Sequence, residues 1–250
     1  MTPRSRRLSD LVWHEVRDWI NNGGSRVIVP FGAQEAHGAV GLGTDTIIPD
    51  TMADPIAESI DALIAPALPY GVLRSLAAYP GSVTLSKETY RTLLNEILEQ
   101  LRANGFSEFI LLNGHAGNHA ALKDAAWELH HRFNVRAMLY DWYFETDDLT
   151  EKFYDGPGGH SGAGETAMVL QARPQAAPEA LKDHGYEDAG TLNPAIQAYP
   201  GPYPVILMEE GKGLPDYNPE TAAAFSRAVI EKAIESIRAV LDRWKKLDLP

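Results

Sequence analysis

The chain of 250 residues contains no cysteine. Disulfide bonds and metal sites with thiolate ligands are therefore excluded. Any metal ion that the protein binds must be held by histidine nitrogen and by oxygen ligands.

Long apolar runs and an excess of positive charge are also missing. No stretch of about 18 apolar residues is uninterrupted, so no membrane partner is expected. The N-terminal segment is broken by Asp10, Glu15 and Asp18, and therefore predicts no signal peptide. The net charge of −12 would repel a phosphate backbone, which argues against a nucleic-acid partner. A cytoplasmic protein is the expectation.

Short apolar runs alternate along the chain with longer stretches of helical periodicity. This alternation predicts βαβ units, with parallel strands and helices on both faces of the sheet. A hydrophobic content of 44% over residues 1–250 suffices for one large core, so a single domain is expected. The predicted class is α/β, a three-layer α/β/α fold with a mostly parallel central sheet. The expected strands are 26–31, 62–68, 108–113 and 135–143, and the expected helices are about 49–61, 86–104, 118–133 and the C-terminal stretch from Pro219.

Two segments carry clear local signals. Ser86 is typical of a helix start, and Asn104 followed by Gly105 is typical of a helix end.

Residues 190–219 contain scattered glycine and proline and are too long for an ordinary connection. We expect them to form a lid, an arm or a subunit contact.

Three polar clusters occupy comparable places in this scheme. One follows the strand at 26–31, one follows the strand at 108–113, and one lies in a glycine-rich turn before a helix. Ligands of open α/β sheets bind beyond the carboxyl ends of the strands, so the clusters are expected to converge there. The clusters are Glu35, His37 and Asp45; Asn113 and His115; and His160 and Glu165.

Convergence of these clusters would crowd carboxylates and imidazoles together. Crowded carboxylates resist ionisation unless a cation neutralises them. One divalent metal ion, or two that share a carboxylate, would supply that cation. Glycines such as Gly32, Gly38, Gly114 and Gly117 let the backbone bend sharply and approach closely. The pattern therefore predicts a metal site with room for a substrate.

Several segments resemble motifs of the creatininase family of amide-cleaving enzymes. Three motifs of that family are matched in the correct order, and the intervening stretch is similar as well. The match extends from residue 30 to about 168, which is more than half of the chain. The matching segments are VPFGAQEAHGAVGLGTD (29–45), LPYG (68–71), YPGSVTLS (79–86), NGHAGN (113–118) and GHSGAGETA (159–167).

The resemblance implies two metal sites that share a carboxylate. Glu35, Asp45 and His115 match the ligands of the first site. His37 and Asp45 match ligands of the second site, so Asp45 would bridge the two ions. The cofactors implied are two divalent ions, and nitrogen and oxygen ligands leave Zn²⁺, Mn²⁺ and Fe²⁺ open.

The chain departs from the family pattern at two places. Creatininase itself completes its second metal site with a glutamate where this chain has Gly117, and the resemblance to members with glycine there implies Glu165 as the replacement. A further His and a Leu-Pro pair of the first motif are replaced by residues 39–42. The first departure argues against creatinine as the substrate, and the second indicates a different pocket wall, so the resemblance implies a family member other than creatininase itself.

The leading hypothesis is a metal-dependent amidohydrolase that cleaves a non-peptide C–N bond of a small molecule. Two metal ions would activate a bridging water as hydroxide, and the substrate would be an amide, a cyclic amide or a formamide. His160 resembles the catalytic histidine of the family and would carry a proton to the leaving nitrogen. Asn118 and Trp142 are candidates for substrate contact, although Asn118 also fits a helix N-cap and Trp142 also fits a core or interface aromatic.

Two alternatives stay open at the level of sequence. A two-metal site also serves phosphoesterases, but no lysine or arginine lies inside the three motifs to bind phosphate. The chain could also be a metal-binding protein without catalysis, in which His160 would have no role in turnover. The family resemblance further implies a homo-oligomer, often a hexamer.

Overall fold

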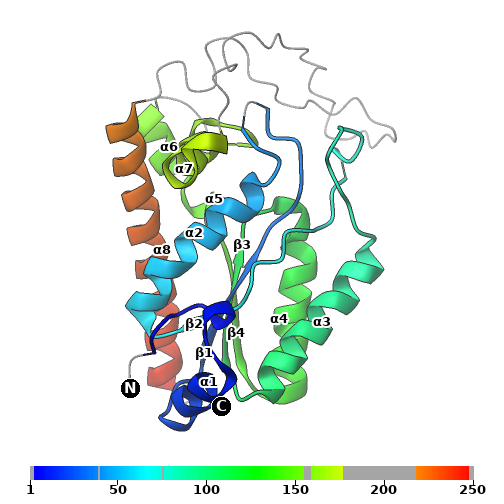
Figure 1. Cartoon of the computed structure of the whole chain (residues 1–250), viewed down its shortest axis with the longest axis vertical. Helices are drawn as coiled ribbons and strands as arrows, with labels where there is room; N and C mark the ends of the chain where they lie inside the picture. The colour runs from blue at the N-terminus through cyan, green and yellow to red at the C-terminus, as the bar shows by residue number, and fades with distance from the viewer. Residues whose placement is uncertain (1–2, 39, 75, 155–158, 177–217, 248–250) are drawn as a thin grey trace.

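The computed structural model describes residues 3–38, 40–74, 76–154, 159–176 and 218–247 (Figure 1). Apart from its last two residues, the segment expected to be a lid, an arm or a subunit contact lies outside this part of the chain. The described strands form one parallel sheet in the order β2-β1-β3-β4. These strands are β1 (Arg26–Phe31), β2 (Leu63–Ile64), β3 (Glu108–Asn113) and β4 (Arg136–Asp141).

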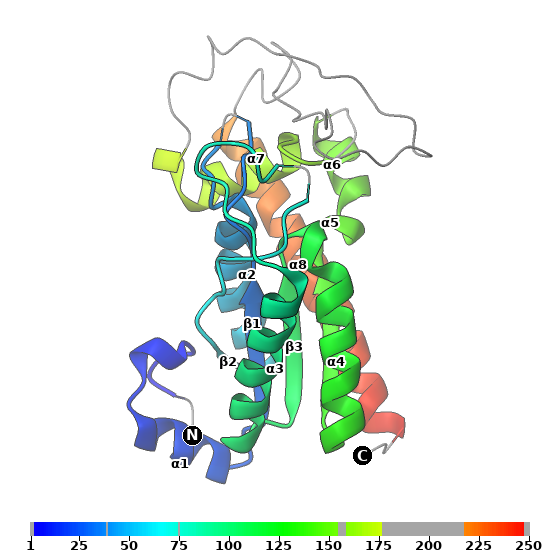
Figure 2. The same cartoon turned by 90° about the vertical axis from the view of Figure 1, so that its right-hand side faces the viewer.

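Alternate residues of the central strands face opposite helical layers. On β1, Val27 and Val29 point toward α1 (Trp13–Asn21), α3 (Lys87–Ala103) and α4 (His119–Phe133). Figure 2 shows α3 and α4 together on this side of the sheet. Because helices cover both faces, β1 and β3 carry continuous apolar runs rather than alternating polar residues.

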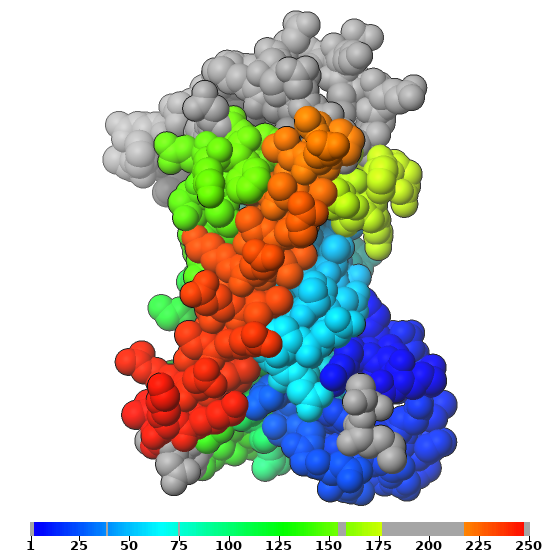
Figure 3. Space-filling view, turned by 90° about the vertical axis from the view of Figure 1, so that its left-hand side faces the viewer, coloured from blue at the N-terminus to red at the C-terminus, as the bar shows by residue number. Residues whose placement is uncertain are grey.

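The other face of the sheet packs against a second set of helices. Ile28 of β1 and Ile110 of β3 belong to this half of the core. The long helix α8 lies on the surface beside α2, as Figure 3 shows. The helices of this side are α2 (Thr44–Ile60), α5 (Trp142–Glu145), α6 (Asp147–Tyr154), α7 (Ala163–Ala172) and α8 (Pro219–Leu247). The predicted three-layer α/β/α architecture is thus confirmed.

Short turns and caps complete the described fold. Ser86 caps α3 by accepting a hydrogen bond from the Thr89 N–H, as its sequence position predicts. The 3-10 turns are η1 (Leu8–Asp10), η2 (Ala116–Asn118) and η3 (Pro174–Ala176). Within the described residues, every helix is too short or too polar to cross a membrane.

The predicted strands 62–68 and 135–143 are longer than the observed ones. Pro66 has no N–H to donate to the sheet, and β2 ends at Ile64, with one further bridge between Phe31 and Leu68. At the other edge, β4 ends at Asp141 because the chain turns into α5 at Trp142.

The helix expected at about 49–61 begins one turn earlier than predicted. Pro49 is typical of a first helical residue, yet α2 begins at Thr44 and contains Pro49 inside it. The proline cannot donate to the Asp45 carbonyl, and Gly114 packs against that carbonyl so closely that a Cβ there would lie 2.0 Å from it. Asp45 is therefore held in the first turn of a helix rather than in a loop.

Candidate metal centre

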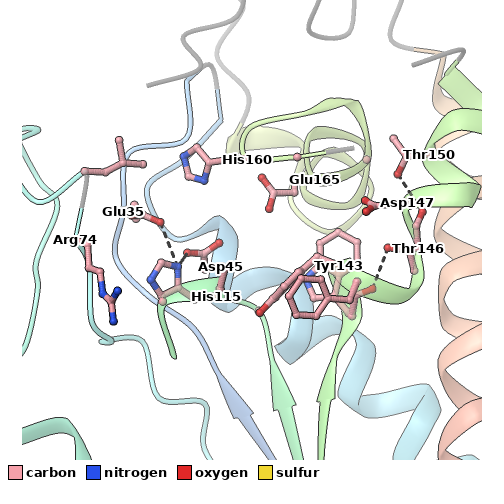
Figure 4. Close-up of a pocket in the computed structure, with 18 of the residues that line it drawn as sticks. Glu35, Asp45, Arg74, His115, Tyr143, Thr146, Asp147, Thr150, His160 and Glu165 are labelled. Atoms are coloured by element: carbon pink, nitrogen blue, oxygen red, sulfur yellow. Dashed lines mark hydrogen bonds and ion pairs between the residues drawn. The ribbon is translucent and has the colours of Figure 1, made fainter. Parts of the chain in front are cut away.

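A cavity of about 540 Å³ opens at the carboxyl ends of β1, β3 and β4 (Figure 4). Five of the six residues predicted to bind metal or transfer a proton line it. They are Glu35, Asp45, His115, His160 and Glu165. The sixth, His37, is buried beside them. The three clusters thus converge at the edge of the sheet that the sequence predicts.

One group of candidate ligands comes from the loops after β1 and β3 and from α2. His115 Nδ1 lies 2.8 Å from Asp45 Oδ2 and 3.2 Å from Glu35 Oε2. Glu35, Asp45 and His115 are all buried, and one ligand atom from each lies within 4.8 Å of the others. This spacing is suited to a single metal ion.

A second group uses the other oxygen of Asp45. His37 Nε2 lies 2.9 Å from Asp45 Oδ1 and 3.8 Å from Glu165 Oε2. These three residues also present ligand atoms within 4.8 Å of one another. Asp45 therefore belongs to both groups, with one carboxylate oxygen directed toward each.

Backbone carbonyls fix the orientation of both imidazoles. His37 Nδ1 lies 2.9 Å from the Glu35 carbonyl, and His115 Nε2 lies 3.1 Å from the Val72 carbonyl. Because a carbonyl oxygen only accepts hydrogen bonds, each of these nitrogens must carry the proton. A neutral ring then presents its other nitrogen, as a lone pair, to Asp45, which is the arrangement that metal-binding histidines use.

The donor atoms of the cluster fit a divalent cation. His37 Nε2 and Asp45 Oδ2 are buried, and neither forms a hydrogen bond of acceptable geometry with a described residue. Buried polar atoms are nearly always satisfied, so atoms without a partner call for an explanation. A cation between the imidazoles and carboxylates would satisfy both atoms.

The pKa values of the cluster reflect its excess of negative charge. Burial opposes the charged form of His37, but Asp45 and Glu165 outweigh it and raise its pKa to about 9. Burial likewise opposes protonation of His115, but Asp45 and Glu35 raise its pKa to about 10. The two imidazoles in turn lower the pKa of Asp45 despite its burial. Burial, assisted by Asp45, raises the pKa of Glu165 to about 7 although His37 opposes this.

We predict that metal ions stabilise the protein more strongly at higher pH. Because folding raises the pKa values of His37 and His115, their protonation stabilises the metal-free fold. This contribution is complete below the histidine pKa of the unfolded chain, and it is lost as the pH rises through about 9 to 10. Metal binding needs deprotonated imidazoles, so its contribution has the opposite pH dependence. The gain in Tm on adding Mn²⁺ to chelator-treated protein should grow between about pH 6 and pH 9. A gain that is constant across this range would contradict protonation of the ligand histidines.

Glu165 is held in place by the turn that precedes α7. The Ser161 N–H donates to Glu165 Oε2 over 2.6 Å. Ser161 adopts a left-handed conformation, with φ of 59°, which a residue with a side chain rarely does. The backbone of the turn is thus bent in the way that aims its N–H at the carboxylate.

His160 lies beside the second group of candidate ligands. Its ring centroid is 4.2 Å from that of His37, and its Nε2–H donates to the Ala36 carbonyl over 2.7 Å. Burial and the positive charge of His37 lower its pKa, which favours the neutral imidazole. Glu35, His37 and His160 also present ligand atoms within 4.8 Å of one another. The position of His160 is thus compatible with proton transfer and with metal binding.

Asn118 does not line the cavity. Its side chain is fully buried, its Oδ1 accepts from the Val72 N–H, and its Nδ2 donates to the Gly32 carbonyl. A Cβ at Gly71 would lie 2.3 Å from Asn118 Oδ1, so this packing is tight. The expected substrate contact therefore has no support here. Asn118 does stand at the N-cap position of α4, but its side chain makes no capping bond to the helix.

Trp142 lines the cavity and also belongs to the core. Only 2% of it is exposed, and it packs within the half of the core formed by α2, α7 and α8. Its Nε1–H has no hydrogen-bond partner among the described residues. The substrate contact expected of Trp142 stays a prediction, which its place in the cavity wall favours.

Gly117 leaves no space for a side chain. A Cβ at this position would lie 2.2 Å from the Val72 carbonyl oxygen and 2.4 Å from His115 Nε2. These two atoms form the hydrogen bond that orients His115. A glutamate ligand at position 117 is thus incompatible with this arrangement, which is consistent with Glu165 occupying the second group.

We predict that Gly117→Ala weakens metal binding. The added methyl group would separate His115 from Val72, and loss of such an orienting bond typically reduces metal affinity by about 10- to 100-fold. Gly41→Ala is a matched control, because a Cβ there would lie 3.6 Å from its nearest neighbour. Isothermal titration of both variants with Mn²⁺ measures the effect. Equal affinities would show that the Val72 contact does not matter.

The structure also reveals a hydrogen-bonded network that motif spacing does not indicate. Asn113 Oδ1 accepts a hydrogen bond from the His115 N–H, and Asn113 Nδ2 donates one to Asp141 Oδ1. Asp141 also accepts from the Tyr143 hydroxyl and contacts His119 Nδ1 at 2.7 Å. The end of β4 thus supports the loop that carries His115. The neighbouring Asn113 and His115 were detectable in the sequence, but their link to Asp141 depends on the pairing of β3 with β4.

Arg74 is a further lining residue outside the three motifs. It lies between the segments LPYG and YPGSVTLS, where the family resemblance assigns no role. The absence of basic residues from the motifs therefore does not mean that the cavity lacks a guanidinium.

Comparisons with known proteins agree with the geometry. A family model described as creatinine amidohydrolase matches residues 9–239. A creatinine amidohydrolase of Pseudomonas putida is 26% identical over 187 residues, which cover 67% of this chain and 72% of the relative. A 3-dehydro-scyllo-inosose hydrolase of Thermotoga maritima is 27% identical over 245 residues, which cover 88% and 76%. A crystal structure of creatinine amidohydrolase superposes with a TM-score of 0.82 at 20% identity, over 94% of this chain and 97% of that one.

Solved structures that share this fold include a zinc–zinc form and a manganese form of creatininase. The two curated relatives described above are named for different substrates, so a substrate does not carry over from either of them. The family match, in contrast, extends over nearly the whole chain. The chain therefore belongs to the creatininase family, a family of metal-dependent amidohydrolases.

Proposed function

We propose that this protein hydrolyses a C–N bond of a small amide, cyclic amide or formamide, with two divalent metal ions as cofactors. The observation that carries the proposal is the position of Asp45, whose two carboxylate oxygens face two separate groups of candidate ligands. Glu35, Asp45 and His115 would hold one ion, and His37, Asp45 and Glu165 would hold the other. Zn²⁺, Mn²⁺ and Fe²⁺ all suit this set of nitrogen and oxygen ligands.

When bound, the two ions would lower the pKa of a water nucleophile and polarise the scissile carbonyl. His160 would move the proton that this reaction transfers. Its Nε2–H is engaged by the Ala36 carbonyl, so the Nδ1 of the neutral ring is the atom that can accept a proton. The same atom would then deliver the proton to the departing nitrogen.

The loop after β3 would stabilise negative charge on the carbonyl oxygen. Ala116 and Gly117 line the cavity and begin the turn η2. The first N–H groups of a helical turn have no partner within it, so they are available to a ligand. Backbone donors aimed at a developing oxyanion are typical of acyl-transfer sites.

Metal-dependent turnover of a panel of small molecules tests the proposal. Chelator-treated protein would be loaded separately with Zn²⁺, Mn²⁺ and Fe²⁺ and assayed against amides, cyclic amides, formamides, a dipeptide and phosphomonoesters. We expect amide hydrolysis that chelation abolishes and metal restores. Faster hydrolysis of phosphomonoesters would favour a phosphoesterase instead. Tight metal binding without turnover of any compound would favour a metal-binding protein without catalysis.

We also propose that the protein is a homo-oligomer, with a hexamer as the expected state. This rests on the family resemblance. Light scattering coupled to size-exclusion chromatography measures the mass directly, and a monomer at micromolar concentration would contradict it.

A further inference from the structure

One wall of the cavity carries a positive charge among acidic residues. Arg74 is the sole lysine or arginine among the described residues that line the cavity. The carboxylates of the same lining are Glu35, Asp45, Asp147 and Glu165. Despite these neighbours, Arg74 forms no ion pair and no hydrogen bond with a residue of the described chain.

The two lining glutamates, which are candidate metal ligands, already have other partners. Glu35 contacts His115, and Glu165 accepts from the Ser161 N–H and faces His37. Arg74 lines the cavity, and Figure 4 shows it on the Glu35 side of His115. A guanidinium presents a planar fork of donors that matches a carboxylate or a phosphate. Its natural partner is thus an anionic group of a molecule that occupies the cavity.

The opposite wall of the cavity is aromatic. Tyr143 lies across His115 from Arg74 in Figure 4, and Phe144 lines the cavity while remaining 66% exposed. The two rings are in edge contact, with centroids 4.7 Å apart. A ligand that spans the cavity would therefore meet a cation at one end, the candidate metal ligands in the middle and an apolar surface at the other end.

We propose that the substrate carries an anionic group, a carboxylate or a phosphate, which binds Arg74 and sets the position of the scissile amide over the metal centre. The inference rests on the proposed function, because the amide is the bond assigned there. It narrows the substrate class from small amides in general to amides of acidic compounds. Arg74 acts in this scheme as a specificity-determining residue.

Three amides that differ only at the far end test the inference. Succinamate carries a carboxylate, 3-phosphonopropionamide carries a phosphonate, and methyl succinamate is neutral. Their binding to the metal-loaded protein would be measured by isothermal titration, for the unchanged chain and for Arg74→Gln. We expect Arg74→Gln to weaken binding of an anionic amide by about tenfold, the effect of losing one charge-assisted contact, and to leave the neutral amide within about twofold.

Two further variants control for indirect effects. Arg74→Lys keeps the charge but not the planar fork, so it should restore part of the lost affinity. Asp147→Asn removes an exposed carboxylate of the same lining and should not weaken binding of the anionic amides. The melting temperature of each variant shows whether it is folded. A preference for anionic amides that survives in Arg74→Gln, or an equal loss for the neutral amide, would overturn the inference.

Binding and turnover separate this inference from the proposed function. An anion preference that depends on Arg74 without amide hydrolysis would refute the proposed function but retain the anion site. Amide hydrolysis with no dependence on Arg74 would support the proposed function but refute the anion site. If only the carboxylate probe or only the phosphonate probe loses affinity in Arg74→Gln, that probe identifies the anionic group. For a hydrolysed probe, a lower kcat/KM is expected in Arg74→Gln, because the amide would lose the contact that sets its position over the metal centre.

Discussion

Asp45→Ala is expected to remove both metal ions and to reduce amide hydrolysis by more than about a hundredfold. The carboxylate faces both ligand groups, with Oδ1 directed toward His37 and Oδ2 directed toward His115. Its loss would leave each group with one carboxylate and one imidazole. Metal content of the purified variant, measured by plasma mass spectrometry, gives the result directly.

Glu58→Ala serves as a matched control for Asp45→Ala. It removes a carboxylate from the same helix, but Glu58 is exposed and lies outside the cavity lining. Its metal content should equal that of the unchanged protein. Retention of one full equivalent of metal by Asp45→Ala would mean that Asp45 binds a single ion and does not bridge two.

His160→Ala is expected to retain metal and to lose turnover. A positioned proton-transfer group typically contributes about 10²- to 10⁴-fold to the rate, so kcat should fall by that factor. The residue also presents a ligand atom near Glu35 and His37, and metal content therefore distinguishes its two possible roles. Kinetics and metal analysis should be carried out on the same preparation.

Added imidazole gives a second readout for His160→Ala. The free base can enter the space left by the side chain and should restore part of the rate if the role is proton transfer. His14→Ala, at an exposed position far from the cavity lining, should leave both the rate and the metal content unchanged. Loss of metal from His160→Ala would reassign the residue as a ligand.

Features coded by neighbouring residues could be predicted from the sequence. The apolar runs of β1 and β3 and the cap at Ser86 are local signals, and the structure confirms them. The convergence of the three polar clusters followed from one general property of parallel sheets, that the carboxyl ends of their strands share an edge. The grouping of the candidate ligands depended on the family resemblance, since spacing alone does not pair His37 with Glu165.

Features that depend on distant contacts could not be predicted. The start of α2 was placed too late, at about residue 49, whereas the helix begins at Thr44 and the close packing of Gly114 against the Asp45 carbonyl holds Asp45 inside it. Asn118 looked available to substrate until its contacts with Gly32 and Val72 were known. Arg74 and Asp141 lie outside the motifs, so their places beside the cavity and behind its wall came from the fold alone.

Anomalous diffraction from crystals of the Mn²⁺-loaded protein tests the central claim most directly. The account predicts two anomalous peaks, one among Glu35, Asp45 and His115 and one among His37, Asp45 and Glu165, with a different oxygen of Asp45 facing each. A single peak in the cavity, or peaks that Asp45 does not touch, would contradict it.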